Sequence, residues 1–220
     1  MSRRTPTWYT HLNTADNIER FLQEDCHHTW GFVIYRCTYE SDNAWDQFMD
    51  RLRYQIQRGL QTYNGLDMMD SLSITVIEDR SLLDDASTSV VREHFKQWAA
   101  TAPQQEQGTG PGLSQRYRYC VQVDADALES VVDDGSETPE IDIMTDGFVN
   151  LIWKDWAPEL LRPNPRFSEP EEEPIEGCTL HDVGWMMVAW QSLMVDRYYY
   201  LREYDDWNRE YRRPPEVATA

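Results

Sequence analysis

The sequence contains no apolar run approaching about 18 residues, the length that a membrane-spanning helix needs. Behind Arg3 and Arg4 it also lacks the apolar segment of a secretory signal peptide. These absences predict a cytoplasmic protein that does not bind a membrane.

Basic residues are few: 20 Lys and Arg stand against 39 Asp and Glu, which gives a net charge of -19. Residues 122–182 contain 17 of the acidic side chains and only Lys154, Arg162 and Arg166, so this stretch contributes -14. Such a surface repels a phosphate backbone, so we expect no binding to nucleic acid. The acidity favours a basic protein partner or, more simply, serves solubility.

Common catalytic signatures are missing too. The chain has no G-x-S-x-G, P-loop, G-x-G-x-x-G or H-E-x-x-H motif, and no repeat of fixed period. No motif calls for a cofactor, and whether the protein is an enzyme stays open.

The four cysteines form no C-x-x-C pair, which argues against a structural zinc site. Cys37 and Cys120 lie in expected strands, so we expect free thiols there, or a disulfide if those strands are adjacent. The segment Cys26-His27-His28 is a weak metal candidate, because adjacent residues rarely bind one ion together. The simpler interpretation is a polar loop that enters a strand.

An apolar content of 40% is enough for a core, and its pattern begins with a strand–helix–strand unit. A short helix is expected over residues 14–24, behind an Asn13 or Thr14 cap. Residues 30–39 predict a strand, apolar positions from Trp45 to Leu60 predict a helix capped by Ser41 or Asp42, and residues 72–78 predict a second strand.

A second such unit follows, with strands over residues 116–123 and 147–153 around a helix at 125–132. Between the two units, residues 87–101 predict an inserted helix and residues 102–112 a flexible loop. Two units of this kind predict an α+β fold with a four-stranded ferredoxin-like sheet.

Proline and glutamate dominate residues 158–177, which we expect to form an acidic surface loop. Thr179 and Asp182 form a capping-box pattern, and apolar positions from Val183 to Leu201 predict a long C-terminal helix. The expected single domain thus has a core with an N-terminal helix (residues 1–157), the loop (158–177) and a helix packed on the core (178–220).

Histidines next to acids are the candidates for catalysis. His94 lies on the inserted helix, while His181 and Asp182 precede the C-terminal helix, so a histidine oriented by a carboxylate is conceivable as a general base. Asp182 is also explained as a helix cap, and His94 as a core residue.

Aromatic residues are abundant, with nine Trp, twelve Tyr and six Phe. They crowd the end of the chain, where they indicate a ligand pocket, a protein interface or a filled core. The candidate ligand or interface residues are Trp30, Tyr35, Trp185, Trp190 and Tyr198.

Three segments, WGFVIYRCTY (residues 30–39), VREHFKQW (91–98) and YRRPPEV (211–217), resemble a group of uncharacterised filamentous-fungal (ascomycete) proteins. The similarity extends over most of the chain. It implies one shared fold and a cytosolic location, and it carries no catalytic residue.

Two functions therefore remain. The first is a protein-interaction or scaffolding module that presents an aromatic surface to a basic partner or to a second copy of itself. The alternative is a small-molecule-binding protein or enzyme, with a pocket between the sheet and the C-terminal helix. Its expected lining is Trp30, Tyr35, His94, His181 and Trp190.

Overall fold

The protein forms a mixed α/β fold around one six-stranded sheet, in a computed structural model that describes residues 12–132, 147–158 and 172–219. The strand order is β2-β1-β3-β4-β5-β6. The strands are β1 (Val33–Arg36), β2 (Thr75–Ile77), β3 (Tyr119–Val123), β4 (Phe148–Trp153), β5 (Trp185–Ala189) and β6 (Val217–Ala218).

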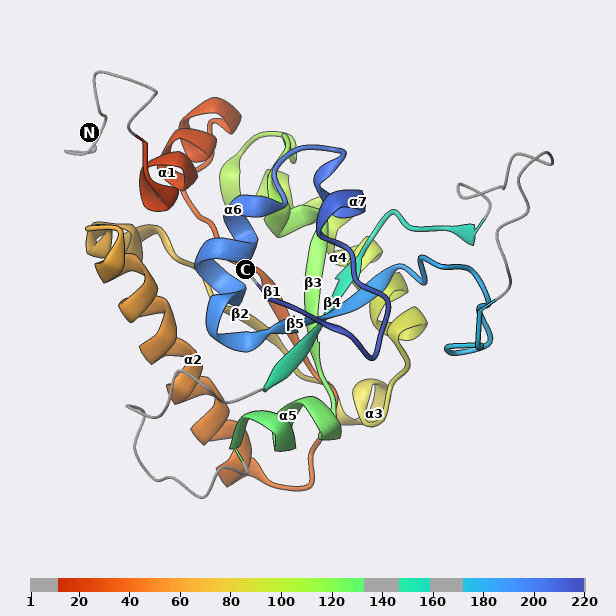
Figure 1. The fold of residues 1–220 in the computed structure, drawn as a ribbon. Helices are drawn as coiled ribbons and strands as arrows, with labels where there is room; N and C mark the ends of the chain where they lie inside the picture. Colours follow the sequence, from red (N-terminus) through yellow and green to blue (C-terminus); the bar gives the residue numbers. More distant parts are fainter. Residues whose placement is uncertain (1–11, 133–146, 159–171, 220) are drawn as a thin grey trace.

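Strand directions divide the sheet into two parts. Strands β2, β1 and β3 are parallel, whereas β4 runs antiparallel to β3 and β5, and β6 runs parallel to β5. Helix α2 (Asp42–Thr62) connects β1 to β2, and α3 (Arg80–Leu83) and α4 (Thr88–Gln107) lead from β2 to β3. Because α2 and α4 lie on opposite faces of the sheet, the winding reverses at the boundary of β1 and β3 (Figure 1).

The larger core lies on the α2 face. Ser41 caps α2 by accepting a hydrogen bond from the backbone N–H of Ala44, as the sequence predicts. The helix then buries an apolar stripe against the sheet, and α5 (Ala125–Val132) lies beside it. Members of this core include Trp45, Phe48, Leu52, Ile56 and Leu60.

Helix α1 (Thr14–Asp25) confirms the predicted N-terminal helix. Asn13 is its N-cap, and a capping box with Asp16 satisfies donors at its first turn. Cys26 is its C-cap, and a φ of 56° places this residue in the left-handed region.

Helix α4 covers the other face. It is longer than predicted, because it continues through Pro103 to Gln107 and ends at Gly108 with a φ of 70°. The expected loop is therefore mostly helix. Val91, Phe95 and Ala99 pack on alternate residues of β1 and β3, which include Val33, Tyr35 and Cys120.

The predicted long C-terminal helix is wrong. Residues Trp185–Ala189 form β5 instead, because alternate residues Met186 and Val188 are buried in the α2-face core while β4 supplies backbone partners. Short helices follow: the 3-10 helix η5 (Trp190–Ser192), the π-helix η6 (Leu193–Arg197), α6 (Tyr198–Tyr200) and α7 (Asp206–Glu210). The strand is apolar on both faces, and the short helices after it add further apolar residues. Together they give an apolar spacing that resembles that of one long helix.

The ferredoxin-like sheet is not confirmed either. The sheet has six strands rather than four, and β1 lies between two parallel neighbours. Most of the expected acidic loop, residues 159–171, lies outside the described residues; its described end forms a β-bridge between Ile175 and Cys178. Among the described residues, no helix has both the length and the apolar character to span a membrane.

Candidate functional site

A pocket of about 410 Å³ opens on the α4 face of the sheet, at the carboxyl end of β3. It is lined by residues 85–88, 122, 124–126, 150, 176 and 185. The volume falls in the range of small-molecule sites, and sheets that are wound in both directions bind ligands at this edge. We refer to it as the carboxyl-edge pocket.

Two buried amide side chains form part of its lining. Gln122 of β3 and Asn150 of β4 are cross-strand partners, and only 2% and 3% of their surfaces are exposed. Gln122 donates from Nε2 to the carbonyl of Ala86 at 2.6 Å. Its Oε1 atom is buried and has no hydrogen-bond partner among the described residues. A buried acceptor without a partner costs free energy, and the packing around this atom gives a ligand in the pocket no access to it.

Asp124 lies at the junction of β3 and α5. Its carboxylate accepts hydrogen bonds from the backbone N–H of Ala127 at 2.9 Å and from Asn150 Nδ2 at 2.7 Å. Burial nevertheless raises the pKa of Asp124 above its usual value, and the nearby charge of Asp126 acts in the same direction. A positive group in the pocket would act in the opposite direction, because it favours the charged form of Asp124.

Glu176 reaches the pocket from the segment before β5. Its carboxylate accepts from the Thr88 backbone N–H at 3.2 Å and from Thr88 Oγ1 at 2.5 Å, so it binds at the first turn of α4. Glu176 has a φ of 47° and Gly177 a φ of 81°, which turn the chain sharply at this point.

Trp185 is the one predicted site residue in the pocket lining. It is half-buried at the start of β5. The other predicted aromatic residues lie elsewhere: Trp30, Tyr35, Trp190 and Tyr198 are all at most 3% exposed.

These buried aromatic side chains have identifiable structural roles. Trp30 donates from Nε1 to the Met68 carbonyl and packs edge-on against Tyr198, with 5.5 Å between the ring centroids. Trp190 belongs to the α2-face core. The exposed aromatic residues of the C-terminal segment are Tyr200 and Tyr204, which is 74% exposed.

The two candidate catalytic histidines have separate partners. His94 Nδ1 lies 3.0 Å from the Tyr35 hydroxyl, and His181 Nδ1 lies 2.6 Å from Glu172 Oε1 at the surface. Asp182 does not cap a helix, contrary to the prediction. It accepts from the Gly184 N–H and from Trp207 Nε1, and burial raises its pKa.

The segment Cys26-His27-His28 does not converge on one point. Cys26 is exposed, His27 is buried with Nε2 at 2.9 Å from the Gly110 carbonyl oxygen, and the His28 backbone donates to Gln107. Within the described part of the chain, no group of three or more His, Cys, Asp or Glu is arranged to hold a metal ion.

All four cysteines are free. Strands β1 and β3 are adjacent, yet Cys120 pairs with Val33, four positions before Cys37. At about 3.3 Å per residue this offset places the two Cα atoms about 13 Å apart along the strands, beyond the reach of a disulfide. Burial raises the pKa of the Cys37 thiol to about 12, so it stays protonated.

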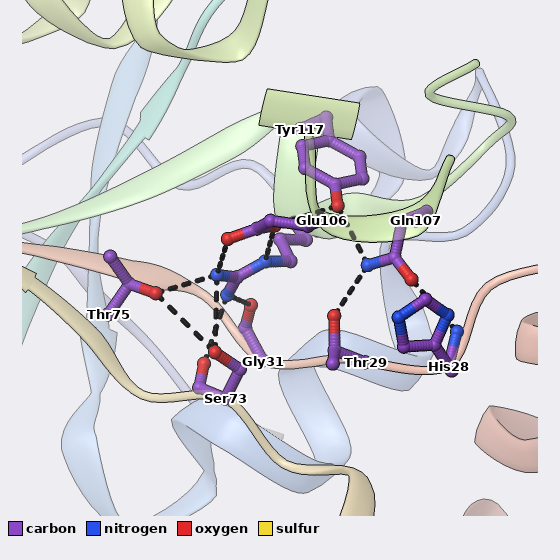
Figure 2. Close-up of polar contacts among 9 residues, drawn as sticks. His28, Thr29, Gly31, Ser73, Thr75, Glu106, Gln107 and Tyr117 are labelled. Carbon is purple, nitrogen blue, oxygen red and sulfur yellow. Dashed lines mark hydrogen bonds and ion pairs between the residues drawn. The ribbon is translucent and has the colours of Figure 1, made fainter. Parts of the chain in front are cut away.

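A second polar cluster lies at the opposite, amino edge of the sheet (Figure 2). Arg116 is 0% exposed and donates to both carboxylate oxygens of Glu106, at 2.8 and 2.7 Å. It also donates to the carbonyls of Gly31 and Ser73 and to the Thr75 hydroxyl. In this Arg116 cluster the guanidinium N–H groups all donate to atoms of the protein, and they connect three other chain segments to Arg116. The guanidinium therefore has no donor left for a ligand.

Sequence reasoning missed Gln122, Asn150, Asp124 and Glu176. One signal was present: an amide in each of two apolar strands, which is unusual for buried positions. The two amides and Glu176 line one pocket although Glu176 is 54 residues from Gln122 in the sequence. This proximity depends on the register of β3 with β4 and on the path of the chain before β5, which the sequence pattern does not show.

Comparisons with models of protein families, with curated proteins and with solved structures give no match.

Proposed function

We propose that the protein is a small-molecule-binding protein whose ligand occupies the carboxyl-edge pocket. The observation that carries this proposal is the 410 Å³ pocket itself, which is lined by two buried amides, four carboxylates and Trp185. Position supports it as well, because the pocket lies at the edge where doubly wound sheets bind ligands. The pocket expected from the sequence, between the sheet and a C-terminal helix, is replaced by this one on the other face.

A fragment screen by NMR on ¹⁵N-labelled protein tests the proposal. Trp185 supplies the reporter, because its indole N–H lies on a pocket-lining side chain and is assigned by comparison with Trp185→Phe. We expect some fragments to shift this signal. Native mass spectrometry gives a second readout, because a retained ligand adds mass to the 26.0 kDa chain.

A pocket-filling variant makes the test specific. Ala125→Trp adds bulk at an exposed lining residue of α5, and Ala100→Trp adds the same bulk at an exposed residue of α4 that does not line the pocket. Fragment binding should be lost in the first variant and kept in the second. Binding that survives in both variants, or no fragment that shifts Trp185, contradicts the proposal.

The interaction module stays a second candidate because Tyr200 and Tyr204 expose 41% and 74% of their surfaces. The net charge of -19 favours a basic protein as the partner, and a second copy of the chain is the alternative expected from the aromatic surface. Sedimentation velocity of the wild type and of Tyr204→Ala tests self-association. A concentration-dependent dimer that the substitution weakens supports this role, and a monomer at all concentrations argues against self-association.

A further inference from the structure

We infer that the carboxyl-edge pocket binds an organic cation, with an ammonium or guanidinium group among the carboxylates of the lining and beside Trp185. This inference rests on the proposed function and specifies its ligand. Four of the lining residues are acidic, namely Asp85, Asp124, Asp126 and Glu176, and none of the described lining residues is Lys, Arg or His.

Helix capping accounts for part of this acidity. Asp124 accepts from the Ala127 N–H at the start of α5, and Glu176 binds at the start of α4. Each helix N-terminus, however, carries only about half a positive charge, so the two helices offset about one of four carboxylates. The buried Arg92 interacts with the charge of Glu176 and offsets part of it as well. The remaining carboxylates keep the pocket negative, which attracts a cation and repels an anion.

The polar groups of the lining require a donor. The amide nitrogens of Gln122 and Asn150 already donate to the Ala86 carbonyl and to Asp124, so the lining offers mainly oxygen acceptors. An ammonium group has three N–H donors and a guanidinium group five, so either can bind more than one carboxylate of the lining.

Trp185 selects the kind of cation. Its indole is part of the same lining, and aromatic faces attract organic cations that shed water easily. An aromatic ring beside carboxylates is therefore better suited to an alkylammonium or alkylguanidinium group than to a strongly hydrated ion.

A matched set of probes tests the charge. Butylammonium, butylguanidinium, butanamide and butyrate are titrated separately into ¹⁵N-labelled full-length protein, and the Trp185 indole signal gives each Kd. We expect the two cations to bind at least about tenfold more tightly than the neutral and anionic probes, because the latter two leave the carboxylates without a counter-charge.

Charge-removing variants locate the site. Asp126→Asn and Glu176→Gln should each weaken cation binding about three- to tenfold, as expected for the loss of one neighbouring charge in a hydrated pocket. Glu129→Gln on the same helix as Asp126, and Glu173→Gln near Glu176, remove exposed acids that do not line the pocket. These controls should change the Kd less than twofold.

The outcomes separate the two proposals. Tighter binding of butanamide or butyrate, or cation binding that the control variants weaken equally, overturns the cation inference and leaves the pocket as a ligand site. No shift of Trp185 with any of the four probes overturns the cation inference, whereas no shift in the whole fragment screen overturns the pocket as a ligand site. A further titration with a lysine-containing peptide distinguishes the source: tighter binding than butylammonium assigns the cation to a protein side chain, and weaker binding assigns it to a free amine.

Discussion

Substitution of Glu106 by Gln tests whether the Arg116 cluster holds the amino edge of the sheet together. The change keeps the shape of the side chain and removes the charge that faces a fully buried guanidinium. Loss of one partner from a buried ion pair costs about 3–5 kcal/mol, because the remaining charge has no counter-ion. Since the Glu106 side chain is 27% exposed, water screens part of this loss, and we expect about 2–3 kcal/mol.

Urea unfolding followed by circular dichroism measures the change in the free energy of unfolding. For a chain of this size the same loss lowers Tm by about 5–10 °C. The matched control is Glu93→Gln on the same helix, where an exposed pair with Lys96 is removed at a cost of about 0.5 kcal/mol or less. Equal losses in the two variants would refute the reasoning, because burial would then have no effect.

The pH dependence gives an independent check. Burial raises the pKa of Glu106, but the hydrogen bonds and the charge of Arg116 outweigh this effect, so the pKa in the folded protein lies below its usual value. A carboxyl group of this kind stabilises the folded state above its unfolded pKa of about 4.3, and the stabilisation is lost as pH falls through the folded pKa. The difference between the wild type and Glu106→Gln should therefore shrink below about pH 4.3.

Three further predictions concern other parts of the fold. Gly184→Ala should lower the free energy of unfolding in urea by at least about 3 kcal/mol, because φ is +78° and a Cβ would lie 2.4 Å from the Trp156 ring. Gly177→Ala is the control: its φ is +81° but its Cβ would meet open space, so it should cost only about 1–2 kcal/mol. Equal costs would disprove the clash at Gly184. Asn13→Ala should lower the free energy of unfolding by about 1 kcal/mol through loss of the α1 cap, and an unchanged urea midpoint would contradict this role. A thiol reagent should modify the exposed and half-exposed cysteines of the native protein and reach the two buried ones only in denaturant, so four fast-reacting native thiols would refute their burial.

Local sequence signals were sufficient to predict the helices that are marked by a capping residue or by an amphipathic pattern. Helix α2 followed from a Ser41 cap and an apolar stripe, and α5 from a short amphipathic pattern with the observed bounds, Ala125–Val132. The β5 segment lacked such a signal, because the run from Trp185 to Trp190 is apolar on both faces. Only pairing with β4 makes it a strand, and that pairing is a long-range effect.

The candidate site was harder to predict for the same reason. The prediction gave weight to histidines and aromatic residues, whereas the pocket is built mainly from amides and carboxylates of distant segments. Trp185 was chosen as an interface residue on a helix, and it lines a pocket from a strand. Its surroundings depended on strand order, which hydrophobic spacing does not encode.

The strands at the two ends of the described sheet limit how copies of the protein can associate. Strand β2 has three residues and β6 has two, so a neighbouring chain would find few free backbone groups to pair with. Growth of the sheet from molecule to molecule, the route to strand-exchanged oligomers and fibrils, is thereby discouraged. The pair Val217 and Ala218 covers part of β5, so truncation before Val217 would uncover a five-residue edge and should increase aggregation on heating.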